Sequence, residues 1–135
     1  MSLIENIKLS EGYRSKVYKC TEGYDTIGYG FAIKDLELSE EVSEIILKEK
    51  LDSLIAKVHK QLPFIKDLPE KAQDVVYEMC YQMGVSGFCK FKRTIAFLRL
   101  EDYNSASREM LDSKWAKQTP NRANKLSEEI YSLNK

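Results

Sequence analysis

Three side chains near the N-terminus can take part in acid–base or nucleophilic chemistry. They are Glu11, Cys20 and Thr26, in the pattern Glu-x8-Cys-x5-Thr. Glu11 follows Ile7 by four residues, so we expect it on the apolar face of a short helix, near the helix C-terminus. Burial and the negative helix end both disfavour an ionised carboxylate. We therefore expect Glu11 to stay protonated near neutral pH, as a general acid must.

Cys20 and Thr26 are expected on a glycine-rich hairpin that follows at once and ends at Gly30. The Thr26 hydroxyl can hold a water molecule, and a Cys20 thiolate can polarise that water or attack carbon directly. Glycoside hydrolysis needs a proton donor on one side of the sugar and a water-activating or nucleophilic group on the other. The alternative interpretation is structural: a surface glutamate, a half-buried strand cysteine and a threonine that suits a strand.

The elements that must position these residues follow from apolar spacing and from helix-breaking residues. A first helix, ending at Gly12, is predicted from Leu3, Ile4 and Ile7. A small antiparallel sheet is predicted, with a turn at 21–23 and strands at 16–19, 24–29 and 31–33. Ser39 is expected to cap a long helix that ends near Gln61, before Pro63. Six further helical segments are predicted at about 70–83, 85–90, 92–100, 103–111, 114–118 and 120–132.

These elements predict an α+β fold that is mostly α, with a three-stranded antiparallel sheet. The 135 residues are enough for a single domain with its own core. Within that domain we expect a sheet lobe at 13–38, a connecting helix at 39–61, and a helical lobe at 62–135 that includes residues 1–12.

The charge composition argues against a nucleic-acid partner. Lys plus Arg and Asp plus Glu both number 21, so the net charge is zero. Residues 35–55 carry seven acids and two lysines, a net of −5, whereas residues 88–125 carry nine bases and four acids, a net of +5. Solvated helix faces are the interpretation we favour, and a basic wall facing an anionic polymer is the alternative.

The remaining composition favours a protein without membrane segments, metal or cofactor. No apolar run approaches a membrane span and no signal peptide opens the chain, so we expect a cytoplasmic protein with no membrane insertion. Three cysteines without metal-like spacing and a single histidine predict neither a disulfide framework nor a zinc site. Cys80 and Cys89 are expected as buried fillers, His59 as a solvent-facing residue, and the aromatic residues around the hairpin as the core of the sheet.

Three motifs resemble the phage-type lysozymes (glycoside hydrolase family 24), in particular those of T-even bacteriophages. The hairpin motif is Tyr18-Lys19-x-Thr21-Glu22-Gly23-Tyr24-x-Thr26-Ile27-Gly28-x-Gly30. A central helix junction matches at Gln82-Met83-Gly84, Gly87 and Phe91. The C-terminal motif is Ser113-x-Trp115-x-x-Gln118-Thr119-Pro120-Asn121-Arg122-Ala123. The resemblance extends over nearly the whole chain and implies a lysozyme-like fold.

The resemblance implies a muramidase, which hydrolyses the β-1,4 bond between N-acetylmuramic acid and N-acetylglucosamine in peptidoglycan. It makes Glu11 the general acid, Thr26 the residue that positions water, and Arg122 the partner of the catalytic glutamate in an ion pair. Cys20 takes a position where the family admits Asp or Cys. Substrate-binding positions fall on Ala32, Tyr81 and Thr94, with residues unlike those of T-even lysozymes at all three, and Glu109 replaces an asparagine. The chain also lacks two helices of the T-even lysozymes.

The leading hypothesis is a monomeric endolysin of a phage or prophage, held in the host cytoplasm until a holin-type lesion releases it to lyse the cell. A lysozyme-like protein that binds glycan without cutting it is a second hypothesis, because a neutral Cys20 thiol stabilises an oxocarbenium ion poorly. A lytic transglycosylase, which needs only the glutamate, is a third. The choice between inverting and retaining chemistry depends on the separation of the two groups and stays open.

Overall fold

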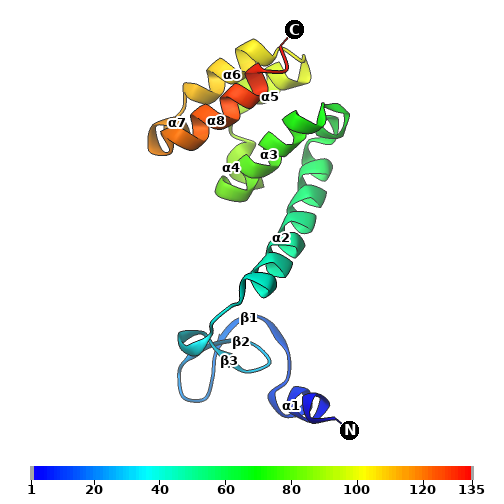
Figure 1. The fold of residues 1–135 in the computed structure, drawn as a ribbon, viewed down its shortest axis with the longest axis vertical. Helices are drawn as coiled ribbons and strands as arrows, with labels where there is room; N and C mark the ends of the chain where they lie inside the picture. The colour runs from blue at the N-terminus through cyan, green and yellow to red at the C-terminus, as the bar shows by residue number, and fades with distance from the viewer. Residues whose placement is uncertain (1, 135) are drawn as a thin grey trace. The chain divides into compact units, whose positions relative to one another are not determined.

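The computed structural model describes residues 2–134, which divide into two compact units, 2–44 and 45–134. Each unit is described by itself (Figure 1). The α+β, mostly α fold class is confirmed, since the described chain combines one three-stranded antiparallel sheet with many helices. The placement of residues 1–12 with the helical lobe stays a prediction.

The first unit begins with α1 (Leu3–Glu11), whose start is fixed by a capping box. Ser2 Oγ accepts from the backbone N–H of Glu5 at 3.1 Å, and the Glu5 carboxylate accepts from the N–H of Ser2 at 3.0 Å. Gly12 ends the helix at φ 71°, where its N–H donates to Lys8 O. The cap and the stop therefore fix Glu11 as the last helical residue before the sheet.

The sheet of the first unit has the strand order β1-β2-β3, with neighbouring strands antiparallel. Its strands are β1 (Arg14–Lys19), β2 (Asp25–Gly28) and β3 (Phe31–Ala32). Thr26 is at the centre, because it pairs with Tyr18 on one side and Ala32 on the other. The prediction that β3 includes Ile33 is wrong, since Ile33 begins the 3-10 helix η1 (Ile33–Asp35).

The aromatic residues around the hairpin do not form the core that we expected. Tyr13 is 66% exposed, and Tyr24 and Phe31 are exposed as well. Within residues 2–44, Thr26 is the one residue that is fully buried. So small a sheet has too little apolar surface to enclose rings of this size.

The second unit contains most of α2 (Glu40–Gln61), whose first turn Ser39 caps by accepting from the Val42 N–H at 3.1 Å. The predicted bounds of this helix are confirmed, but Val58 alone of its described side chains is buried. After α2 come η2 (Pro63–Asp67), α3 (Glu70–Met83), α4 (Val85–Phe88), α5 (Lys92–Arg99), α6 (Tyr103–Leu111), α7 (Lys114–Gln118) and α8 (Pro120–Tyr131). The helix η2 was not predicted.

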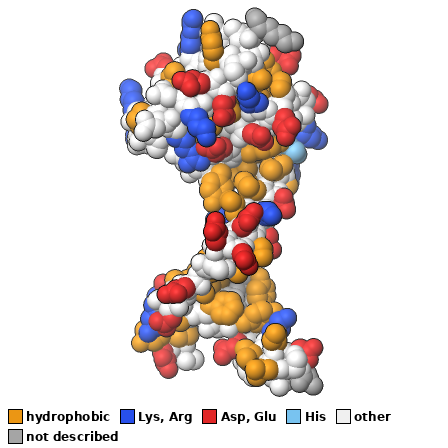
Figure 2. Space-filling view, viewed as in Figure 1, with side chains coloured by type: hydrophobic (Ala, Val, Ile, Leu, Met, Phe, Trp, Pro, Cys, Tyr) orange, Lys and Arg blue, Asp and Glu red, His pale blue; other side chains and the backbone are white. Residues whose placement is uncertain are grey.

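The core of the second unit lies among α3, α5, α6 and α8, which Figure 1 shows packed side by side. Its largest fully buried side chains include Phe88, Met79, Leu98, Met110 and Ile130. On the face in Figure 2, acidic and basic side chains are interspersed over this unit. That mixture fits solvated helix faces better than a wall of one charge.

Two expectations about the second unit are corrected. His59 is not a free surface residue: its Nε2 lies 2.7 Å from the Tyr77 hydroxyl, and the two rings meet edge to face. Cys80 is buried as expected, whereas Cys89 is only partly buried and its thiol donates to Gln61 Oε1 at 3.4 Å. Both contacts join residues far apart in the sequence.

Candidate active site

A pocket of about 290 Å³ in the first unit brings together four of the predicted site residues, Glu11, Cys20, Thr26 and Ala32. They come from α1, the end of β1, β2 and β3. The rest of the lining is Tyr18, Glu22, Tyr24, Gly30, Lys34 and Asp35. The last two belong to η1 and had no predicted role, because they lie outside the hairpin motif.

Glu11 reaches this pocket because the turn between β2 and β3 has no side chain where its carboxylate lies. Gly30 has φ +75°, and a Cβ built on it would overlap Glu11 Oε2. Glycine therefore meets two needs at position 30, the left-handed backbone and the close approach of the carboxylate. Within the first unit the Glu11 side chain is exposed, and so are the apolar residues of α1, so this unit by itself does not provide the burial that we expected for Glu11.

Thr26 faces the pocket from the centre of the sheet and is only 3% exposed. Its hydroxyl donates to Tyr24 O at 2.9 Å. With its proton used in this bond, the hydroxyl oxygen can accept a hydrogen bond from a water molecule. A water held in that way keeps its own lone pairs free to attack carbon.

Cys20 lies at the turn that joins β1 to β2. Its N–H donates to Tyr24 O at 3.0 Å, and its carbonyl accepts from the N–H of Gly23 at 2.9 Å. The pKa of the Cys20 thiol is lowered from its ordinary value, first because the backbone N–H of Tyr24 favours the thiolate, and then because the backbone N–H of Glu22 and the neighbouring Thr26 hydroxyl favour it too. Partial burial and the charge of Glu22 oppose this shift.

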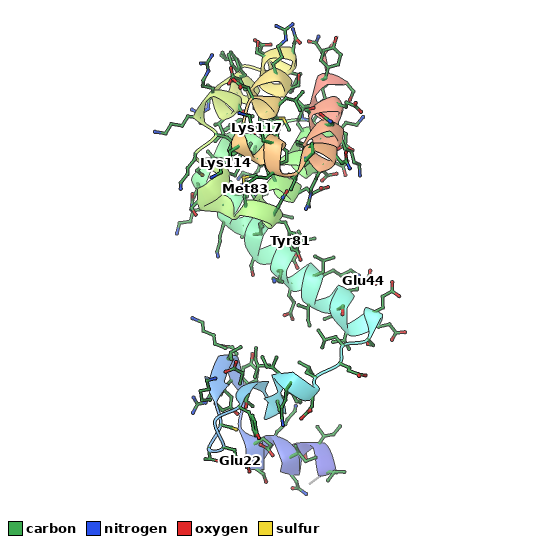
Figure 3. All side chains as sticks on the ribbon, turned by 90° about the vertical axis from the view of Figure 1, so that its left-hand side faces the viewer. Glu22, Glu44, Tyr81, Met83, Lys114 and Lys117 are labelled. Atoms are coloured by element: carbon green, nitrogen blue, oxygen red, sulfur yellow. The ribbon has the colours of Figure 1, made fainter. Side chains whose placement is uncertain are left out.

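Glu22 itself lies in the same turn, where Figure 3 labels it. Its backbone N–H favours the Cys20 thiolate while its carboxylate disfavours it. The turn predicted from the glycine-rich motif therefore places backbone N–H groups where they favour a negative charge on the sulfur. The sequence contained that signal, since amides exposed by tight turns bind anions.

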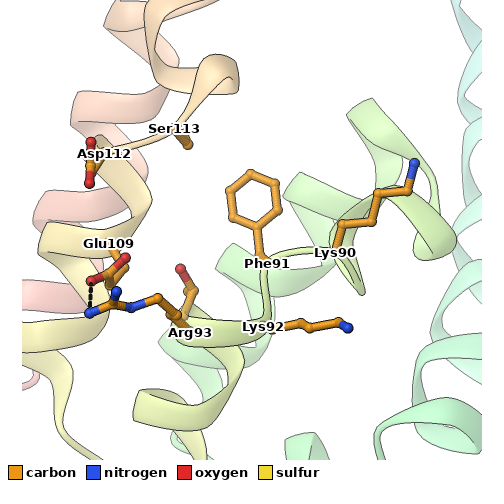
Figure 4. Close-up of a pocket in the computed structure, with 8 residues that line it drawn as sticks. Lys90, Phe91, Lys92, Arg93, Glu109, Asp112 and Ser113 are labelled. Atoms are coloured by element: carbon orange, nitrogen blue, oxygen red, sulfur yellow. Dashed lines mark ion pairs between the residues drawn. The ribbon is translucent and has the colours of Figure 1, made fainter.

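The predicted residues of the second unit lie in separate places. Tyr81, on α3, is 44% exposed and lines a groove of about 880 Å³ with residues of α2 and α4 (Figure 3). Thr94, on α5, is only 2% exposed and lines a pocket of about 290 Å³. Glu109 lines that pocket too and is 3.1 Å from Arg93, as the dashed line in Figure 4 shows. The structure does not bring Tyr81 and Thr94 into one pocket.

Arg122, in the first turn of α8, donates through Nε to Glu78 Oε2 on α3 at 2.8 Å. Sequence reasoning missed Glu78, because nothing in the spacing of two residues 44 apart predicts their contact. Trp115 is buried as part of the core, and its Nε1 donates to Gln82 Oε1 at 2.9 Å. The ion pair of Arg122 with Glu11 stays a prediction.

The chain matches the family model described as phage lysozyme over residues 8–129. The chain belongs to the phage lysozyme family. The predicted resemblance to phage-type lysozymes is therefore confirmed. As a lysozyme, the protein is a glycoside hydrolase, and its substrate is peptidoglycan.

Curated relatives of this family member include a probable T4-type lysozyme 1 of Dictyostelium discoideum, 27% identical over 93% of this chain and 91% of the relative. An endolysin of Acyrthosiphon pisum secondary endosymbiont phage 1 is 30% identical over 82% of this chain and 75% of the relative. A pre-baseplate central spike protein of Enterobacteria phage T4 is 26% identical over 99% of this chain, which spans only 28% of that protein. The same module therefore occurs both as most of a protein and as part of a larger one.

The described part of this lysozyme offers no group of three or more His, Cys, Asp or Glu residues that could hold a metal ion. Its described helices are also too short or too polar to cross a membrane.

Proposed function

We propose that the chain is an endolysin that cuts the β-1,4 bond between N-acetylmuramic acid and N-acetylglucosamine through Glu11, Cys20 and Thr26. The observation that supports this most is the shared pocket, in which these three side chains converge from three different elements. Its size of about 290 Å³ suits part of one sugar ring and a water molecule.

In the proposed reaction, Glu11 gives its proton to the glycosidic oxygen as the bond from that oxygen to the anomeric carbon breaks. A water molecule held by the Thr26 oxygen attacks the anomeric carbon and loses a proton to the Cys20 thiolate, which becomes a thiol. The Cys20 thiolate, favoured by the N–H groups of Tyr24 and Glu22, lies where it can polarise this water and stabilise positive charge on the sugar.

A direct attack of the Cys20 thiolate on the anomeric carbon is the alternative course. It would form a covalent thioether that water then hydrolyses, with retention of configuration. NMR of the first product during hydrolysis distinguishes the two courses. The inverted anomer supports attack by water, and the retained anomer supports attack by sulfur.

The substrate-binding roles of Ala32, Tyr81 and Thr94, and the pairing of Arg122 with Glu11, belong to this proposal as well. Ala32 has the best support, because it lines the pocket of Glu11. The half-exposed Tyr81 ring can stack on a sugar. Thr94 has little exposed surface, so it can contact a sugar only through the part of its side chain that lines its pocket.

The endolysin role includes waiting in the host cytoplasm, as a monomer, until a holin-type lesion gives access to the wall. Fractionation of cells that express the chain with and without a holin tests this role. Lysis and wall-bound protein should need the holin. Export of the native chain without a holin would contradict the proposal.

A protein that binds glycan without cutting it is the competing function, and the thiol in place of a carboxylate at Cys20 is what favours it. Zymography on purified peptidoglycan distinguishes the two. Cleared zones support the enzyme, whereas a pull-down of the chain with peptidoglycan and no clearing supports the binder.

A further inference from the structure

The backbone of Tyr24 contacts two of the residues that carry the proposed reaction. Its carbonyl oxygen accepts from the Cys20 N–H at 3.0 Å and from the Thr26 hydroxyl at 2.9 Å. Its own N–H is the first of the groups that favour the Cys20 thiolate. A shift of the Tyr24 backbone would therefore move the thiol and the hydroxyl together.

Tyr24 is only weakly restrained by the hairpin to which it belongs. It lies between Gly23, at φ +86°, and Asp25, the first residue of β2. Tyr24 is 44% exposed, and within residues 2–44 only Thr26 is fully buried. No apolar core of this unit therefore encloses the Tyr24 ring, and the contacts of that ring at the surface decide how well the residue is held.

Lys34 provides such a contact from outside the hairpin. Its Nζ lies 4.0 Å from the centroid of the Tyr24 ring. An ammonium within about 6 Å of a ring centroid is attracted to the face of the ring. Lys34 belongs to η1, which packs against β2, so the contact joins a second element to the turn. Among residues 2–134, its ammonium has neither an ion pair nor a hydrogen bond that would compete with the ring.

We infer that Lys34 is a positioning residue, which holds the Tyr24 ring and thereby the backbone groups of Tyr24 that contact Cys20 and Thr26. The inference rests on the proposed function, which assigns the reaction to these two residues together with Glu11. It explains why a lysine with no predicted role lines the pocket of the three candidate catalytic residues.

A direct effect of the Lys34 charge on the thiol is the alternative. The groups that lower the pKa of Cys20 are backbone N–H groups and a hydroxyl, and Lys34 is not among them. The two explanations also differ in their dependence on Tyr24. An effect through the ring disappears when the ring is removed, whereas a direct effect of charge remains.

A double-mutant cycle of Lys34→Met and Tyr24→Leu tests the inference in the full chain. It has two readouts: the pH dependence of Cys20 alkylation, and kcat and KM on purified peptidoglycan fragments. Lys34→Met should lower the Cys20 thiolate fraction at neutral pH, and kcat, by about two- to fivefold, the range for one exposed cation–π contact. KM should stay nearly unchanged. Lys34→Met should have no further effect in the Tyr24→Leu background, and Lys34→Arg, which keeps a cation on the ring, should behave as the wild type.

Lys19→Met is the matched control, because it removes the same charge from the same hairpin. Lys19 pairs with Asp25 at 2.7 Å, and the two side chains are 69% and 54% exposed. An ion pair so open to water contributes little. Lys19→Met should therefore leave both readouts unchanged.

Three results would overturn the inference: wild-type alkylation of Cys20 in Lys34→Met, the same loss in Lys19→Met, or an undiminished effect of Lys34→Met in the Tyr24→Leu background. A raised KM with unchanged kcat would also overturn it, since Lys34 would then hold the sugar itself. If Tyr24→Leu does not fold, Lys34→Arg decides, and an Arg variant as impaired as Met contradicts the inference. Full activity of both Cys20→Ala and Thr26→Val would instead contradict the proposed function, while the alkylation of Cys20 would still test the contact.

Discussion

Glu11 at the end of α1 lies directly against Gly30 in the turn between β2 and β3, in the space that a side chain at position 30 would occupy. The contact joins a helix end to a hairpin turn and fixes where the carboxylate enters the pocket. Any residue larger than glycine must displace Glu11 or distort the turn.

Replacement of Gly30 by alanine should therefore impair both folding and activity. The strain at φ +75° should reduce the free energy of unfolding by about 1–2 kcal/mol. The overlap with the carboxylate should also lower kcat on the order of a hundredfold. Gly23→Ala is the matched control, since Gly23 has φ +86° with open space around its Cβ position. It should lose similar stability and keep most of its activity, as urea unfolding and turbidity assays can establish.

Alkylation should distinguish the cysteines. Because the pKa of Cys20 is lowered, its thiolate forms at lower pH than the thiolate of a free cysteine. Since the thiolate is the reactive form, its alkylation rate should also rise at lower pH. Burial raises the pKa of Cys80 to about 12, so Cys80 should scarcely react at pH 8. Mass spectrometry after brief iodoacetamide treatment should find Cys20 modified first, together with loss of lysis.

Two substitutions test whether the loss of lysis on alkylation of Cys20 is due to the loss of a catalytic thiol. Cys20→Ala should strongly reduce lysis, whereas Cys20→Asp should keep substantial activity, because the carboxylate can also polarise the water. A fully active Cys20→Ala variant would make the thiol a bystander and leave the reaction to Glu11 and the water at Thr26.

Thr26 should be sensitive to loss of its oxygen and tolerant of loss of its methyl group. Thr26→Val removes the bond to Tyr24 O and should cost about 1 kcal/mol of stability. It should also reduce kcat on the order of a hundredfold, because the water loses its acceptor. Thr26→Ser keeps the hydroxyl and should retain most of the activity. Equal activity of the two variants would show that the hydroxyl does not hold the attacking water.

Sequence reasoning located the elements well where the local signals were strong. The spacing of apolar residues and the breaks at Gly84 and Pro120 determine the helices of the second unit, because helix ends depend on nearby residues. The strands were harder: β3 is only two residues long, and Ile33 turns into a 3-10 helix that alternation of side chains cannot predict.

The sequence predicted which residues form the candidate active site, but it predicted few of the contacts between side chains. The motif placed Glu11, Cys20 and Thr26 together, since all three belong to one short stretch of chain. The bonds of His59 to Tyr77 and of Arg122 to Glu78 join distant segments, and nothing local specifies them. The exposure of Glu11 within the first unit was also not predicted, because helical spacing indicates which residues share a face and not what covers that face.

The central claim is that Glu11 donates the proton in hydrolysis of the glycan, and digestion of purified peptidoglycan by the wild type and by Glu11→Gln tests it most directly. Mass spectrometry of the products should find reducing N-acetylmuramic acid ends with the wild type. The folded Gln variant should be slower by at least about a hundredfold, the lower end for general acid catalysis. Products with 1,6-anhydromuramic ends would indicate a transglycosylase, and undiminished cleavage by Glu11→Gln would contradict the account.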